Sequence, residues 1–172
     1  GPLGNRFTPP SKDQTALLVG GGVGIPPMIY WANELKGRPA VAFCGALSRD
    51  LIPLTILGQA TEPDLNIREF AECGIPSVVS TDDGSFGVRG FVTQALEGYL
   101  DGPARGTPPI IYTCGPEAMM RRVADIALSR GIECQVAVER AMACGMGTCQ
   151  SCVIRVRKPD PARPPLPGSE WC

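Results

Sequence analysis

The sequence predicts an α/β protein in which a doubly wound, five-stranded parallel sheet is followed by a small, loop-rich domain. Three observations lead to this prediction. Short apolar runs alternate with segments of helical pattern over residues 14–139, which implies right-handed crossovers between parallel strands. A run of glycines separates the first apolar run from the first helical segment. Three of the eight cysteines then crowd one loop after the last apolar run.

The composition excludes several classes of site. The 172 residues carry a net charge of −1, so nothing suggests binding to nucleic acid or to an anionic membrane surface. No apolar run approaches the roughly 20 residues that a membrane-spanning helix needs. The chain has no histidine, which excludes Ser-His-Asp catalysis, His-bearing zinc sites and Rieske ligation. The chain length and the cysteine spacing argue against a secreted disulfide scaffold, and we expect a reducing, cytoplasmic location.

The first predicted strand and helix flank the glycine-rich turn. Residues 16–20 form an apolar run that is typical of a buried parallel strand, and residues 28–36 have a helical pattern. The turn between them, Gly-Gly-Gly-Val-Gly-Ile-Pro-Pro, would let a phosphate approach backbone N–H groups at a helix N-terminus. Ile25 or Pro27 replaces the third glycine of G-x-G-x-x-G, so the turn alone fits either a nucleotide site or a plain tight turn.

The second predicted strand, residues 39–44, does not end on the acidic residue that commonly binds the ribose of a dinucleotide. Asp50 comes later, where helix capping explains it as well as ligand binding does. Ser48 and Arg49 would meet a ribose or a 2′-phosphate, or would simply be solvated. Residues 51–70 give the least clear pattern, and we expect a helix and a connecting loop there.

Three further strands are predicted at residues 77–81, 109–113 and 132–138, with helices at 91–100 and 116–130. The last of these helices has Pro116 near its first position and Glu117 in its first turn, as helix starts favour.

Three turns of the chain fall at carboxyl ends of predicted strands, at residues 20–24, 81–84 and 114–117. Ligands of open parallel sheets bind at that edge, so the coincidence favours a nucleotide site. The alternative for residues 82–90 is a glycine-rich turn with acidic caps. A calcium loop does not fit, because the acidic spacing is wrong.

The cysteine loop has the spacing C-x4-C-x2-C at Cys144, Cys149 and Cys152, and Cys172 is the next cysteine along the chain. This is the plant-type spacing for a [2Fe–2S] cluster. The glycines between the first two cysteines suit a loop that turns its N–H groups toward sulfur. The alternatives are a disulfide pair or a zinc site, but zinc usually takes two separated cysteine pairs or cysteine mixed with histidine.

Four motifs resemble one known family when they are taken together in this order. They are Gly-Gly-Val-Gly-Ile-Pro-Pro, Thr-Asp-Asp-Gly-Ser-Phe-Gly, Cys-Gly-Pro-Glu and Met-Ala-Cys-Gly-Met-Gly-Thr-Cys-Gln-Ser-Cys. The sequence resembles the ferredoxin–NAD(P)H reductase superfamily and, within it, the electron-transfer subunits of type B dihydroorotate dehydrogenases. Residues 1–7 also resemble the segment where the FAD-binding barrel of that family passes into its NAD domain. We therefore prefer a natural linker there to the remnant of an expression tag.

The resemblance implies an electron relay in pyrimidine biosynthesis. Dihydroorotate is oxidised on a partner subunit that carries FMN, in an assembly that is expected to be a heterotetramer. Electrons pass through the [2Fe–2S] cluster to FAD and leave as hydride to NAD. The alternatives are a related NAD(P)H-dependent reductase subunit of a hydrogenase or sulfite reductase, and a non-catalytic metal-binding module.

The resemblance also assigns residues to each cofactor. The pyrophosphate would face Gly21, Gly22, Gly24, Ile25 and Pro26. The nicotinamide would be flanked by Thr81, Asp82, Asp83 and Gly84 and by Cys114, Gly115, Pro116 and Glu117, with Cys114 as the catalytic residue. Iron would be held by Cys144, Cys149 and Cys152, with Cys172 as the candidate fourth ligand.

The expected organisation is a linker over residues 1–13, an NAD-binding domain over 14–139 and a [2Fe–2S] domain over 140–172. Two departures from the family lead us to expect a chain truncated at both ends and inactive by itself. The FAD barrel that precedes these motifs is absent. So is the final hydrophobic-Cys-acidic-Gly-Pro segment, and we therefore suspect that the true fourth ligand lies beyond Cys172.

Overall fold

The computed structural model describes residues 6–102 and 106–154. These residues belong to two compact units, which divide between Val138 and Glu139. The predicted linker and the predicted cysteine-rich domain both extend beyond the described residues, and the boundaries that we drew for them remain predictions.

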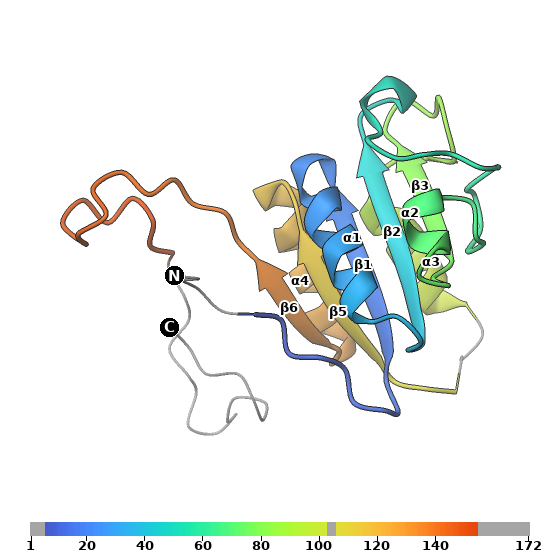
Figure 1. The fold of residues 1–172 in the computed structure, drawn as a ribbon, viewed down its shortest axis with the longest axis horizontal. Coiled ribbons are helices and arrows are strands. Elements are labelled where there is room, and N and C mark those ends of the chain that lie inside the picture. Colours follow the sequence, from blue (N-terminus) through green and yellow to red (C-terminus); the bar gives the residue numbers. More distant parts are fainter. Residues whose placement is uncertain (1–5, 103–105, 155–172) are drawn as a thin grey trace. The chain divides into compact units, whose positions relative to one another are not determined.

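The first unit is built on a parallel sheet (Figure 1), in which the described residues supply six strands in the order β4-β3-β2-β1-β5-β6. The strands are β1 (Thr15–Gly21), β2 (Ala40–Ala46), β3 (Ser77–Thr81), β4 (Val88–Arg89), β5 (Pro109–Cys114) and β6 (Glu133–Ala137). The α/β class and the parallel sheet are confirmed. The prediction of five strands missed β4, because its two residues are too few to show a period of alternation.

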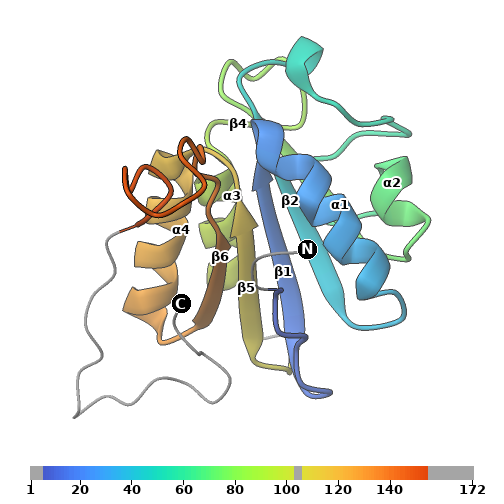
Figure 2. The ribbon, with the colours of Figure 1, turned by 60° about the vertical axis from the view of Figure 1, so that its left-hand side comes forward.

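Helices cover both faces of this sheet. Figure 2 shows α1 and α2 on one side and α3 and α4 on the other. The helices are α1 (Ile25–Glu34), α2 (Arg68–Ala71), α3 (Val92–Asp101) and α4 (Glu117–Arg130), with 3₁₀ turns η1 (Gly22–Gly24) and η2 (Arg49–Leu51). This is the doubly wound arrangement that the alternating pattern predicted.

The helix expected within residues 51–70 is wrong for most of that range, since only η2 and α2 are helical there. Ile52, Leu54 and Ile56 are instead partly buried against the core on the α1 side. Every second residue packs inward, which is the habit of an extended chain and not of a helix. An isolated bridge between Ile56 and Ile67 closes this loop.

The sheet is buried on both faces, so its central strand reads as a continuous apolar run. On β1, Ala16 and Leu18 belong to the core beneath α1, whereas Leu17 and Val19 belong to the core beneath α3 and α4. All four side chains are 0% exposed. Burial on both faces holds the carboxyl edge of the sheet, which carries the candidate site, on a rigid base.

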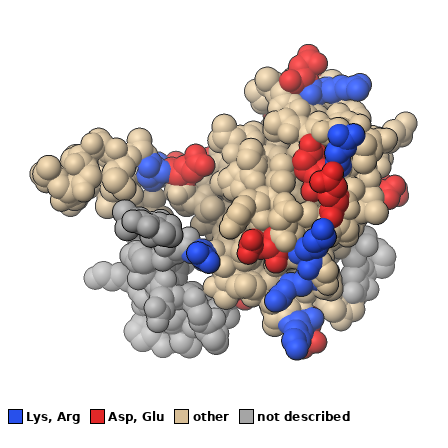
Figure 3. Space-filling model, viewed as in Figure 1, with Lys and Arg blue, Asp and Glu red and all other residues tan. Residues whose placement is uncertain are grey.

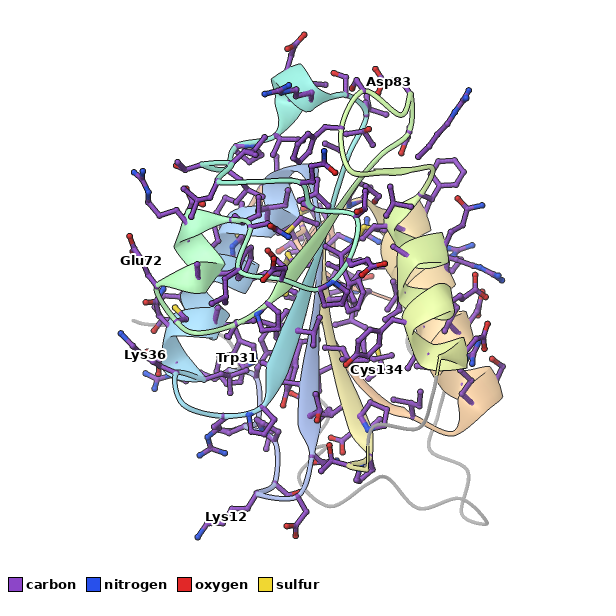
Figure 4. All side chains as sticks on the ribbon, turned by 90° about the vertical axis from the view of Figure 1, so that its right-hand side faces the viewer. Lys12, Trp31, Lys36, Glu72, Asp83 and Cys134 are labelled. Atoms are coloured by element: carbon purple, nitrogen blue, oxygen red, sulfur yellow. The ribbon has the colours of Figure 1, made fainter. Side chains whose placement is uncertain are left out.

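The segment before β1 is bound to the α1 side of the sheet. The ring of Phe7 lies 5.5 Å from that of Trp31 and 5.2 Å from that of Tyr112, centroid to centroid. The Tyr112 hydroxyl donates to the Thr8 carbonyl at 2.7 Å, and the Thr8 N–H donates to Gln135 Oε1 at 2.8 Å. Trp31 belongs to α1 and is labelled in Figure 4. The described part of the expected linker is therefore held in place by packing and hydrogen bonds.

Burial of the Cys44 thiol is expected to make the folded chain less stable at alkaline pH. Burial, with a smaller contribution from Glu69, raises the pKa of the Cys44 thiol from 9.0 to about 12. The folded chain therefore keeps a proton that the unfolded chain loses above about pH 9. The contribution of this thiol to the free energy of unfolding is fully present below pH 9. We expect it to fall by about 1.4 kcal/mol per pH unit as the pH rises toward 12.

Urea unfolding at pH 8, 9, 10 and 11 measures this slope. Comparison with Cys44→Ala isolates its share, because the variant has no thiol to ionise at that position. An equally steep decline in Cys44→Ala would show that Cys44 contributes nothing to the alkaline loss.

Candidate functional site

The predicted nucleotide-binding turns all lie at the carboxyl edge of the sheet. β1 pairs with β2 on one side and with β5 on the other, so the order in which strands are added to the sheet reverses at β1. The turn after β1 is thus at the topological switch point, where open α/β sheets bind ligands. Figure 4 shows Asp83, from the loop after β3, at this end of the molecule, while Lys12 lies at the opposite end.

The turns after β1 and β5 are packed directly against each other through glycines. A Cβ atom built on Gly24 would overlap the carbonyl oxygen of Cys114, and one on Gly115 would stand 2.8 Å from the carbonyl oxygen of Gly21. One on Gly21 would stand 2.5 Å from Met119 Sδ. Close packing of the two turns therefore requires glycine at Gly24 and Gly115, whereas a side chain at Gly21 would overlap only the flexible end of Met119. The approach of a phosphate to these glycines remains a prediction.

Gly22 is the glycine of this turn that faces open space. Its φ of +51° is in the left-handed region, and no atom lies within 4 Å of a Cβ built on it. Gly22, Val23 and Pro26 are exposed, whereas the Ile25 side chain is fully buried in the core. Of the residues assigned to the pyrophosphate, Gly22 and Pro26 are thus accessible, while Ile25 anchors the turn from below.

The start of α1 offers fewer N–H donors than most helix N-termini. Pro26 and Pro27 occupy its first turn and have no N–H group. The Ile25 N–H already donates to the Gly22 carbonyl. Backbone donors for an anion at this turn must therefore come from Gly22 to Gly24.

The loop after β3 is shaped by two of its predicted site residues. The Thr81 hydroxyl donates to the Phe86 carbonyl at 2.7 Å and accepts from the Phe86 N–H at 3.0 Å. Asp83 Oδ1 accepts from both the hydroxyl and the N–H of Ser85, at 2.6 and 2.9 Å. These bonds lower the pKa of Asp83, whereas burial and the neighbouring Asp83 raise the pKa of Asp82. Thr81 and Asp83 thus set the loop conformation, while Asp82 is exposed.

This loop is also joined to the end of β2. The Asp82 N–H donates to the Ala46 carbonyl at 3.1 Å, and the Asp83 N–H donates to the Leu47 carbonyl at 3.2 Å. Ser85 was not among the predicted site residues, although an aspartate whose side chain accepts from the N–H two positions on is a common turn signal that points to Ser85.

The segment after β5 places its cysteine inside the protein. The Cys114 side chain is only 3% exposed and belongs to the core beneath α1. Pro116 is the N-terminal cap of α4, and Glu117 in its first turn pairs with Arg121 across 3.4 Å at the surface. The catalytic role assigned to Cys114 remains a prediction, and in the described structure the thiol itself is covered.

The cysteine loop lies in the second unit, which begins at Glu139. Hydrogen bonding by the N–H groups of Cys149 and Met146, by the Cys149 side chain and by the Thr148 N–H lowers the pKa of the Cys144 thiol to about 6. Gly145 and Gly147 have φ of +66° and +83°. Glycine reaches this conformation without strain, as the predicted loop requires.

The second cysteine of the loop is held by a serine. Cys149 Sγ lies 3.2 Å from Ser151 Oγ, and the hydrogen bonds from Ser151 lower the pKa of the Cys149 thiol. Ser151 Oγ also lies 3.1 Å from the Ala141 carbonyl oxygen, so its one hydroxyl hydrogen can serve either partner, and the contact joins the two ends of the loop. The signal for Ser151 in the sequence is only its position between two predicted ligands.

Cys144 and Cys149 are hydrogen-bonded neighbours. Within residues 6–102 and 106–154, however, no group of three His, Cys, Asp or Glu side chains is gathered closely enough to hold a metal ion. Cys152 is exposed in the same loop, and Cys172 lies outside the described residues. The full set of iron ligands therefore remains a prediction.

Charges over the first unit are mixed, and Figure 3 shows positive and negative side chains interspersed on the face that carries α1. No helix in the described part of the chain is both long and apolar enough to cross a membrane.

Comparison with known proteins agrees with this geometry. A family model described as the iron-sulfur cluster binding domain of dihydroorotate dehydrogenase B matches residues 139–163. The electron transfer subunit of dihydroorotate dehydrogenase B (NAD(+)) from Caldanaerobacter subterraneus is 32% identical over 92% of this chain and 56% of its own length. The probable counterpart from Methanocaldococcus jannaschii is 34% identical over 90% of this chain and 54% of its own length.

Solved structures give the same fold. An NADH-dependent reduced ferredoxin-NADP oxidoreductase is 31% identical with a TM-score of 0.63, over 88% of this chain and 50% of that one. The ferredoxin reductase of carbazole 1,9a-dioxygenase has a TM-score of 0.52 at 20% identity, over 80% of this chain and 41% of that one, which is a likeness of fold alone. The chain spans about half the length of the electron transfer subunits that it matches. The resemblance predicted from the motifs is therefore confirmed, and this chain is related over nine-tenths of its length to the electron transfer subunits of dihydroorotate dehydrogenase B.

Proposed function

We propose that this chain carries the dinucleotide-binding and cluster-binding parts of an electron-transfer subunit of the dihydroorotate dehydrogenase B kind. The observation that carries the proposal is the presence, in one chain, of a doubly wound sheet with a glycine turn at its switch point and of a cysteine loop with C-x4-C-x2-C spacing and two glycines of positive φ. The first is suited to a nicotinamide dinucleotide and the second to an iron–sulfur cluster.

The cysteine loop suits a [2Fe–2S] cluster because thiolates are the ligands that iron–sulfur clusters take. Cys144, Cys149 and Cys152 would hold it with a fourth thiolate, for which Cys172 or a later cysteine is the candidate. When bound, the cluster would supply a carrier that accepts and passes on electrons. The N–H groups of Met146, Thr148 and Cys149 would stabilise the negative charge on sulfur.

The edge of the sheet suits NAD. Gly22 to Gly24 would bind the pyrophosphate through backbone N–H groups, and the exposed Pro26 would line the same turn. Asp82, Gly84 and the start of α4 would flank the nicotinamide.

The remaining parts of the activity would be supplied by a further domain and by a partner subunit. FAD would be bound by a barrel outside these residues, and FMN by a catalytic partner subunit that oxidises dihydroorotate. We propose a cytoplasmic heterotetramer of the two kinds of subunit, in pyrimidine biosynthesis.

A second candidate function is supported by the similarity to an NADH-dependent reduced ferredoxin-NADP oxidoreductase at 31% identity. In that case the chain would belong to another NAD(P)H-linked reductase with a different electron donor. Mixing the cluster-loaded chain with either reduced ferredoxin or an FMN subunit plus dihydroorotate, and following the bleaching of its visible absorbance, distinguishes the two donors.

Anaerobic reconstitution with iron and sulfide tests the cluster part of the proposal. We expect about two iron and two acid-labile sulfide per chain, an S = 1/2 EPR signal on reduction, and binding of a nicotinamide dinucleotide in calorimetry. The purified chain should hold much less than one flavin. A colourless protein with one tightly bound zinc would contradict the cluster assignment, and one FAD per chain after gel filtration would contradict the assignment of flavin to other residues.

A further inference from the structure

The α1 side of β6 is covered by the extended chain that precedes β1. Gln135 of β6 is in register with Tyr112 of β5, whose side chain is fully buried in the core beneath α1. Residues 7–10 lie against these two strands, and Figure 1 shows the dark blue chain passing β6 on its way to β1. Pro10 is buried, and Phe7 packs against the same core. This short segment is therefore part of the packing of the first unit.

One side chain of β6 binds the backbone of this segment as the peptide group of a neighbouring strand would. Gln135 Oε1 accepts from the Thr8 N–H at 2.8 Å, and Gln135 Nε2 donates to the Thr8 carbonyl at 3.3 Å. The Tyr112 hydroxyl donates to the same carbonyl at 2.7 Å. Farther along, Arg38 Nη1 donates to the Pro10 carbonyl at 2.8 Å. These polar contacts hold the backbone, while the ring of Phe7 supplies the apolar anchor.

The strand that receives these contacts is at the edge of the sheet. Among the strands that the structure describes, β6 is hydrogen-bonded to β5 alone, and α4 packs on its other face. Gln135 is its central residue, and the boundary between the two units follows at Val138 and Glu139. The contact between Thr8 and Gln135, which are 127 positions apart, therefore joins the chain that enters the first unit to the strand that leaves it for the cysteine loop.

We propose that residues 7–10 act as a clasp that positions β6, with Gln135 and Tyr112 as its positioning residues. When the clasp is docked, it holds the strand from which the second unit begins. When it is released, β6 keeps only its contacts with the sheet and with α4. A pull on the chain ahead of Phe7 is then transmitted to the start of the cysteine unit through one hydrogen-bonded side chain. The inference goes beyond the proposed function, because it holds whether or not a dinucleotide or a cluster is bound.

A second partner of Gln135 offers the alternative. Gln135 Nε2 also lies 3.3 Å from Glu133 Oε1, and this contact would stiffen β6 without any help from residues 7–10. The structure favours Thr8 because its N–H makes the shorter bond to Gln135, at 2.8 Å. Glu133 also lies on β6 itself, so its contact cannot tie the strand to another element. The two alternatives differ in how Gln135 and Phe7 depend on each other.

Amide hydrogen exchange on the 172-residue chain, followed by mass spectrometry, tests the clasp. Gln135→Met keeps the length of the side chain and removes both polar groups, so residues 133–138 should exchange about tenfold faster. Tyr112→Phe keeps the buried ring and should act in the same direction by a smaller factor. Residues 16–19, which are fully buried on β1, should change by less than about twofold in both variants.

Gln14→Met is the matched control for Gln135→Met. Gln14 Oε1 accepts from the Ser11 N–H, within the chain that precedes β1, so the same chemical change is made away from β6. Residues 133–138 should exchange at the wild-type rate in this variant. Faster exchange there, equal to that of Gln135→Met, would overturn the assignment of Gln135 as a positioning residue.

Phe7→Ala decides between the clasp and the contact with Glu133. It removes the apolar anchor, so residues 133–138 should exchange as fast as in Gln135→Met. Adding Gln135→Met to Phe7→Ala should then change their exchange by less than about twofold, because the amide has already lost its partner. Equal effects of Gln135→Met with and without Phe7 would show that Gln135 acts through Glu133, and would overturn the proposal. Wild-type exchange of residues 133–138 in both Gln135→Met and Tyr112→Phe would overturn it as well.

Discussion

Replacing Cys149 by serine is expected to abolish the [2Fe–2S] cluster and its EPR signal. Cys149 is the middle ligand of the predicted set and also a hydrogen-bonding neighbour of Cys144, so the change removes one thiolate and disturbs another. Loss of an outer partner of a metal ligand typically costs about tenfold to a hundredfold in metal affinity, and loss of the ligand itself should cost more. Iron and acid-labile sulfide per chain, measured after anaerobic reconstitution, give the result directly.

Cys134→Ser is the matched control for this experiment. Cys134 lies on β6, outside the cysteine loop, and is partly buried. Iron content should therefore stay at the wild-type level in that variant. If Cys149→Ser retained the wild-type iron and sulfide content, the assignment of Cys149 as a ligand would be wrong.

Gly24→Ala is expected to destabilise the first unit by about 3 kcal/mol and to eliminate dinucleotide binding. Its φ of −81° suits any residue, so the cost is steric and comes from the added methyl group. That methyl would overlap the carbonyl of Cys114, and nearby backbone has little room to move because β1 and β5 are paired strands. Clashes of this kind in a packed interior are among the few changes with such large effects.

Gly22→Ala is the comparison that separates packing from conformation. A methyl at Gly22 meets open space, and only the positive φ opposes it, at a cost of about 1 kcal/mol. Urea unfolding of both variants, followed by calorimetry with a dinucleotide, tests the pair. A Gly24→Ala protein as stable as wild type would show that the two turns are not packed as the structure has them.

The elements that could be predicted are those whose cause is local. β1 and α4 were found from an apolar run and from a helix start at Pro116 with a stop at Gly131, which has φ of +66°. The cysteine loop was recognisable because its ligand spacing and its two glycines act within nine residues. Signals of this range survive in a single sequence because neighbouring residues alone decide them.

What could not be predicted depends on contacts between distant segments. Gly24 was assigned to phosphate binding. The reason that no side chain fits there is the carbonyl group of Cys114, ninety positions away along the chain. Thr81 was assigned to the nicotinamide, yet its hydroxyl donates to the Phe86 carbonyl in the loop that follows β3. The pairing of β4 with β3 could not be predicted from the sequence either, since two residues are too few to show an alternating pattern. These features arise only once the sheet has formed.

The ring packing around Trp31 gives this protein an optical readout of its own. The chain has two tryptophans, and Trp31, which is 7% exposed, is in contact with Phe7 as well as with Tyr112 at 5.4 Å. Release of the segment around Phe7 would uncover the indole to water while leaving the sheet intact. The emission wavelength of Trp31 in a variant without Trp171 would then report docking of that segment separately from global unfolding, so that fluorescence and far-UV circular dichroism need not change together.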